Sequence, residues 1–179
     1  MKRYNEFFER GEEYTEALRE ELTLRRNVLP SILLPVMQTA CECYLDHVII
    51  NLYQYKSRDD FVNSKGITHS LSQLYRETLF DRLRRTENEA LKKFIPYDRT
   101  LSSDLARLFM AYRNNRYVRP DYISEPDAAD MFDFFDTVFQ CKKLAEEFNE
   151  HIPEIFKDIE EEIKLKQARN KVRRERDDI

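Results

Sequence analysis

The sequence predicts an all-α protein, an up-and-down helical bundle of four to five helices with a C-terminal helical extension. Apolar residues recur at helical spacing along most of the chain, and no segment alternates apolar and polar residues as a strand would. The chain has two glycines, whereas tight hairpins and the phosphate loops of sheet-based nucleotide folds depend on glycine. The 179 residues suffice for one domain. We expect the bundle over residues 1–150 and an amphipathic, then basic, extension over 151–179.

The composition indicates which classes of protein the chain can belong to. Charged residues make up 36% of the chain and hydrophobic residues 41%, which fits solvated helix faces around a core. The net charge of -4 gives no general reason to expect nucleic-acid binding, so such a surface would have to be local. No apolar run approaches the roughly 20 residues of a membrane span, and the N-terminus lacks a signal-peptide core. We therefore expect a cytoplasmic protein with no membrane contact.

The first segment predicts an amphipathic helix with one stripe to bury, formed by Tyr4, Phe7, Phe8, Tyr14, Leu18 and Leu22. Pro30 and Pro35 bracket the entry to a second helix, which begins near Leu33 or kinks there and runs to about Tyr55. This second helix is apolar on two faces, which is typical of a helix in the middle of a bundle or at a subunit interface.

Three further helices are expected before residue 150. A polar break at 63–69 predicts a loop and leads into the third helix. The fourth follows Pro96 and the capping candidates Asp98 and Thr100, and the fifth starts at a capping box at 124–127. Their apolar stripes are Leu71, Leu74, Tyr75 and Leu79; Leu101, Leu105, Leu108, Phe109 and Tyr112; and Ala128, Met131, Phe132, Phe135, Val138, Phe139 and Phe148.

The extension is expected to form a further helix from Pro153, whose apolar stripe ends at Ile163. Between Lys164 and Arg176 there are seven basic residues and one acidic residue, Glu175. A solvated helix end explains such a run, since cations suit a helix C-terminus. A nucleic-acid contact or an assembly surface is the alternative.

The clearest local cluster is the basic stretch 112–122. Arg113 and Arg116 are three residues apart, so on a helix they project from one face. Arginines at the edge of a core face require an anionic partner, which is either a carboxylate or a phosphate. Candidate carboxylates for an internal salt bridge are Glu42, Asp46 and Asp104.

The histidines and cysteines give weaker indications. His47 lies on a largely apolar helix, where a hydrogen-bonded core residue is the commoner role, and His69 follows a loop as a local cap or packing residue. Cys41 and Cys43 are two residues apart on a helix and cannot pair, so with Cys141 they are interpreted as small buried residues in a reducing compartment. No metal-ligand spacing is present, and we expect neither a metal nor a cofactor.

Three stretches, in order, resemble the HEPN family of helical bundles. Residues 40–49 resemble its Ala-x-Glu-Lys-x-x-Lys helix, although Asp46 stands where a lysine is usual. Residues 66–74 are similar to its Gly-His-x-Leu-x-x-Leu segment, and residues 116–128 resemble its Arg-Tyr-Pro-x segment. The resemblance covers roughly residues 4–150 and leaves the extension outside.

The resemblance implies a four- or five-helix bundle that usually dimerises and places basic residues near the dimer cleft. Some members are RNA-cleaving toxins, others bind nucleotides, and many pair with a minimal nucleotidyltransferase. The cleaving members carry a histidine shortly after an Arg–polar pair. Arg113 and Asn114 supply that pair here, but positions 118–120 are Val, Arg and Pro. Since an imidazole is the principal general acid or base, we predict no ribonuclease activity.

The leading hypothesis is a non-catalytic HEPN-like module, expected to be a homodimer. It would bind a nucleotide, RNA or a protein partner such as a nucleotidyltransferase through a basic face made of Arg113, Asn114, Arg116, Tyr117 and Arg119. The secondary candidates for that ligand site are Glu42, His47 and His69. One alternative is a divergent HEPN ribonuclease of toxin–antitoxin type that uses one of the two histidines. Another is a purely architectural bundle that dimerises through its second and fifth helices.

Overall fold

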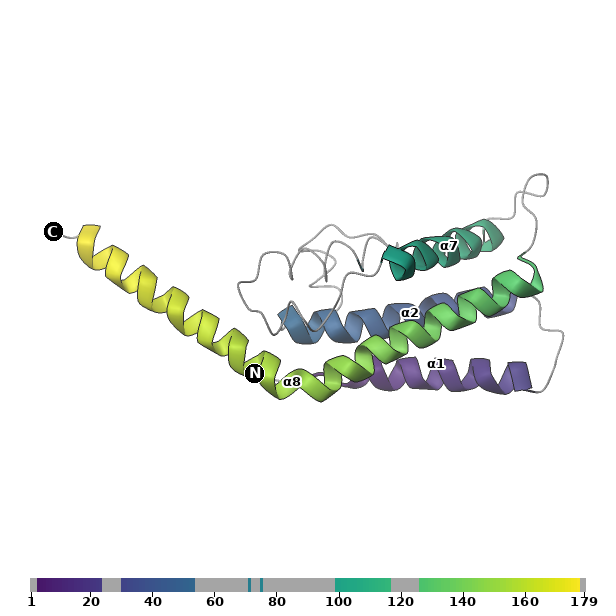
Figure 1. Cartoon of the computed structure of the whole chain (residues 1–179), viewed down its shortest axis with the longest axis horizontal. Helices are drawn as coiled ribbons and strands as arrows, with labels where there is room; N and C mark the ends of the chain where they lie inside the picture. Colours follow the sequence, from purple (N-terminus) through teal and green to yellow (C-terminus); the bar gives the residue numbers. More distant parts are fainter. Residues whose placement is uncertain are drawn as a thin grey trace.

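The computed structural model describes residues 3–23, 30–53, 71, 75, 99–116 and 126–177. These ranges hold no strand and four helices: α1 (Glu6–Thr23), α2 (Pro30–Tyr53), α7 (Arg99–Arg116) and α8 (Ala128–Asp177). Along the bundle, α1 and α7 run in one direction and α2 and α8 in the other (Figure 1). The prediction of an all-α helical bundle is confirmed. Most of the expected third helix lies outside the described residues, but Leu71 and Tyr75 from it are buried.

The central element is α2, which packs against α1, α7 and α8. Every residue from Ala40 to Leu52 except Glu42 is buried. A helix this apolar on all sides is stable only where neighbours cover each face. It starts at Pro30, earlier than expected, and continues through Pro35. No helix in the described ranges is long and apolar enough to cross a membrane.

The face that α1 buries differs from the predicted stripe. Gly11, Thr15 and Leu18 are buried, whereas Tyr14 and Leu22 are exposed. Residues 11, 15 and 18 lie four and three apart and therefore share one face, which is the face that meets α2. Tyr14 lies beside that face, whereas Leu22 shares its register but lies one residue from the end of α1 and is 38% exposed, so the prediction was wrong about both. The smallest residue of α1, Gly11, therefore lies at its contact with α2.

The helix α8 is one continuous element of 50 residues, not the two helices expected on either side of Pro153. Its bundle-facing stripe alternates four- and three-residue steps and consists of Phe134, Val138, Cys141, Ala145, Phe148, Ile152, Ile155 and Ile159. Phe132 was expected in this stripe, but it is 68% exposed because it falls out of that register. Asp127 caps the helix, since its Oδ1 accepts a hydrogen bond from the Asp130 amide at 2.9 Å.

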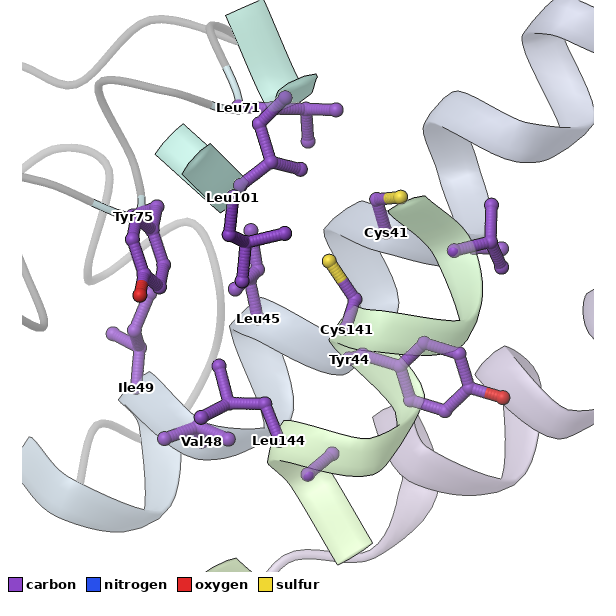
Figure 2. Packing of buried hydrophobic residues seen from close by; sticks show 14 of the residues in the cluster. Cys41, Tyr44, Leu45, Val48, Ile49, Leu71, Tyr75, Leu101, Cys141 and Leu144 are labelled. Carbon is purple, nitrogen blue, oxygen red and sulfur yellow. The ribbon is translucent and has the colours of Figure 1, made fainter. Parts of the chain in front are cut away.

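Figure 2 shows how buried side chains from several helices meet around α2. Leu45 and Ile49 of α2 lie toward Leu101 of α7 and the buried Leu71 and Tyr75. On the other side, side chains of α8 cover α2. The core is therefore one cluster that α2 shares with each of its neighbours.

Substituting Gly11 by alanine should destabilise the bundle. A Cβ at this position would lie 2.7 Å from Cε1 of Tyr44, whose side chain is fully buried. Alanine gains about 1 kcal/mol in helix propensity, but overpacking a core costs roughly 1–3 kcal/mol. We expect the free energy of unfolding, measured by urea denaturation, to fall by about 1 kcal/mol.

Glu13→Ala is the control, because Glu13 is an exposed residue of the same helix. Its effect should stay within about 0.5 kcal/mol. A Gly11→Ala variant as stable as the parent would mean that α1 does not approach Tyr44 this closely.

Candidate functional site

Two of the predicted ligand-binding arginines lie at the end of α7. Arg113 and Arg116 are both exposed and belong to its last turn. The guanidinium of Arg116 donates a hydrogen bond to the Tyr112 hydroxyl at 2.6 Å and lies 5.9 Å from the centroid of that ring. Asn114 is half-buried between them. Tyr117 and Arg119, the other members of the predicted basic face, lie outside the described residues.

Arg107 is an arginine of α7 already engaged with carboxylates. It lies 3.1 Å from Asp130 and 3.3 Å from Asp133 on α8, and 3.8 Å from Asp104. Asp104 was a candidate partner for the terminal arginines, but Arg113 is nine residues further along, about 14 Å at 1.5 Å per residue. The pairs are exposed and contribute about 1 kcal/mol or less each. They join α7 to α8 and neutralise Arg107.

His47 lies inside the bundle. It is fully buried, and its ring packs against Phe8 and Phe148, with centroids 5.3 and 6.0 Å away. Its Nε2 hydrogen-bonds to Oδ1 of Asn149 at 2.8 Å, while Nδ1 lies 3.4 Å from the amide nitrogen of Asn51. Burial lowers the pKa of His47, against the opposing effect of the Asn149 bond. The structure therefore holds this imidazole neutral and away from solvent.

The remaining secondary candidates are Glu42 and His69. Glu42 is the one half-buried residue in the buried stretch of α2, and it accepts a hydrogen bond from the Gln38 amide at 2.9 Å. His69 lies outside the described residues. Of the predicted site residues, Arg113, Asn114 and Arg116 therefore lie together at one end of α7, and His47 is enclosed in the core.

Sequence reasoning missed a polar cluster that joins three helices, which we call the interhelical tie (Glu12, Thr15, Tyr44 and Lys142). The Tyr44 hydroxyl donates to Glu12 at 2.6 Å and lies 2.9 Å from the Thr15 hydroxyl. Lys142 of α8 donates to the other oxygen of Glu12 at 2.6 Å. In the sequence Glu12 is one of several glutamates of the first helix, and its spacing does not distinguish it from the others.

The tie has defined protonation states. Burial tends to raise the pKa of Glu12, but hydrogen bonds from Lys142 and Tyr44 and the nearby positive charges lower it overall. Burial and the bond to Glu12 raise the pKa of Tyr44. Glu12 is therefore held as a carboxylate and Tyr44 as a neutral phenol, and their bonds fix α1 and α8 on α2.

The cysteines are free thiols. Cys41, Cys43 and Cys141 are all buried, and Figure 2 shows Cys41 of α2 and Cys141 of α8 side by side in the core. Burial and the contact with Cys141 raise the pKa of Cys41 well above its ordinary value. The Cys41 thiol therefore remains protonated, and all three cysteines pack as small apolar side chains.

Comparisons with known proteins do not assign the chain to a family. No family model, curated protein or solved structure matches the chain. Within the described ranges, no group of three or more His, Cys, Asp or Glu side chains is arranged to hold a metal ion.

The free energy of unfolding of the bundle should decrease as the pH is lowered, because His47 is buried in its neutral form. A lowered pKa means that the unfolded chain takes up the proton first, as the pH falls below the ordinary value of 6.5. Protonation then favours the unfolded state, so the free energy of unfolding decreases from that pH downward. His47→Gln removes this titration and should flatten the dependence, measured by urea unfolding at several pH values between roughly 7 and 5.

His151→Gln is the matched control, because His151 is an exposed histidine of α8. The slope of that variant should follow the parent. Equal slopes for the parent and His47→Gln would contradict the burial of a neutral imidazole, whatever the absolute stability of the variant.

Proposed function

We propose that this protein is a non-catalytic, HEPN-like module that binds an anionic ligand through Arg113 and Arg116. The ligand class is a nucleotide or RNA phosphate, or the carboxylates of a protein partner such as a nucleotidyltransferase. Asn114, Tyr117 and Arg119 belong to the same proposed face. The single observation that carries the proposal is the exposure of both guanidinium groups in the last turn of α7.

The surroundings of the arginines support this assignment. The bond between Arg116 and the Tyr112 hydroxyl holds one guanidinium at the surface, with an aromatic ring beside it. Guanidinium groups bind phosphate and carboxylate in a bidentate manner, and an adjacent ring offers a face for stacking. Arg107 of the same helix forms ion pairs with Asp130 and Asp133. The two exposed guanidinium groups and the Tyr112 ring at the end of α7 support the binding of an external anion there.

The enclosure of His47 favours binding over catalysis. A general acid or base must come within hydrogen-bond reach of the proton it transfers. His47 is fully buried and bonded to Asn149, so substrate would reach it only after the bundle opened. The resemblance to the HEPN family adds a homodimer and a nucleotidyltransferase partner to the proposal, and both rest on that resemblance.

The double variant Arg113→Ala/Arg116→Ala tests the proposal. Each charged hydrogen bond contributes roughly 1.5 kcal/mol or more, so affinity for a labelled nucleotide or single-stranded RNA should fall at least about tenfold. Co-purifying protein and nucleic acid are quantified in parallel to identify a protein ligand. Because both side chains are exposed, the thermal midpoint should stay within about 2 °C.

The charge-matched control is Arg10→Ala/Lys157→Ala, which removes two exposed cations from α1 and α8. It should retain binding. An equal loss in both variants would mean that net charge alone matters, and a large drop in the thermal midpoint of Arg113→Ala/Arg116→Ala would mean that these arginines are structural. Either result contradicts the proposal.

A further inference from the structure

The basic charge of this acidic chain is strongly segregated. Residues 164–176 hold seven basic residues and one acidic residue, so this block has a formal charge of +6 while the whole chain has -4 and the remainder -10. A favourable interaction with the helix macrodipole is confined to about the last turn. The block spans more than three turns of α8, so the macrodipole does not account for it.

The basic residues continue the register of the buried stripe. The bundle-facing positions of α8 end at Ile155 and Ile159 and advance by alternate steps of three and four residues. The same steps lead through Glu162 to Lys166, Arg169, Arg173 and Arg176. One line along the helix is therefore apolar where α8 covers α2 and basic where α8 has left the bundle. Between 166 and 176 this line is about 15 Å long.

The basic part of α8 is open to solvent. Figure 1 shows the C-terminal half of α8 bending and extending away from the other helices. Pro153, inside the helix, lacks the amide needed for its hydrogen bond and is the kind of residue at which helices bend. Every residue from Lys164 to Asn170 is exposed, as is Arg173. The part of α8 from Lys164 to Asp177, which we call the C-terminal arm, extends about 20 Å at 1.5 Å per residue.

The chemistry of this line favours nucleic acid over protein. A helix that pairs with a protein, or with a second copy of itself, places apolar residues at the positions that alternate by three and four. On the basic line itself, those positions hold Lys166, Arg169 and Arg173, which would repel one another in a self-pair. Exposed ion pairs with an acidic protein contribute little. Contacts with phosphates gain from the release of condensed counterions, and arginine matches phosphate geometry.

We propose that the C-terminal arm of α8 is a second binding surface, on which Lys166, Arg169 and Arg173 contact the phosphate backbone of a nucleic acid. The surface lies beyond the end of the bundle where α2 ends, whereas Arg113 and Arg116 lie at the opposite end (Figure 1). It binds independently of those arginines. Contacts to phosphates carry no sequence information, so the proposed contact is governed by charge and not by sequence.

The test uses the full chain and the variant Lys166→Gln/Arg169→Gln/Arg173→Gln, because glutamine keeps helix propensity while removing charge. Fluorescence anisotropy measures binding to a labelled 20-nucleotide RNA strand and, in a second arm, to a 20-base-pair DNA duplex. At low salt the affinity for the preferred form should fall at least about tenfold. For the single strand, three lost phosphate contacts should reduce the slope of log K against log salt by about 2.

The matched control is Lys164→Gln/Lys171→Gln/Arg174→Gln, which removes three positive charges from the same arm at positions outside the line. Its affinity should fall less than about threefold. Equal losses in both variants, or no binding by the parent chain to either nucleic acid, would overturn the proposal. A parent chain that self-associates through the arm in light scattering, without binding nucleic acid, would also overturn it. In Arg113→Ala/Arg116→Ala the loss caused by the arm substitutions should persist, which separates this surface from the first.

Discussion

The burial of α2 on all sides is the constraint on which the rest of the structure depends. A helix with apolar side chains around its whole circumference cannot remain in water, so its neighbours must cover each face. α1, α7 and α8 each contact it. Leu71 and Tyr75, which come from another part of the chain, also belong to the same buried cluster. The bundle is therefore organised around one helix and not around a shared central axis.

This constraint explains the unusual polar and small residues in the core. Gly11 lets α1 approach the Tyr44 ring, and the Tyr44 hydroxyl is then satisfied by Glu12 and Thr15. Lys142 completes the tie from α8. His47 is accommodated in the same way, with Asn149 as its partner. Buried polar groups are tolerated when each is bonded, and here the bonds also fix the relative positions of three helices.

The helix class could be predicted from spacing, and so could the central position of α2. The side chains that meet across helices could not. Tyr14 and Phe132 fit a helical period of apolar residues, but several phases of that period were compatible with the sequence, and the buried faces are those that contain Gly11 in α1 and Phe134 in α8. Leu22 shares the buried register of α1 but lies one residue from its end. Pro153 is typical of a helix start, yet it lies inside α8. The interhelical tie depends on tertiary contacts between residues 12, 44 and 142, which no local pattern encodes.

Of the predicted basic face, Arg113 and Arg116 lie where their spacing placed them, on one helix end.

Native-state amide hydrogen exchange tests the central role of α2 most directly. Amides between Ala40 and Leu52 should exchange only through global unfolding, with protection equal to the full free energy of unfolding. Those of the α8 arm beyond Lys164 should exchange through local fraying, because nothing described covers that segment. Protection in α2 that is no greater than in the arm would contradict the account, since the helix proposed to organise the bundle would then open without it.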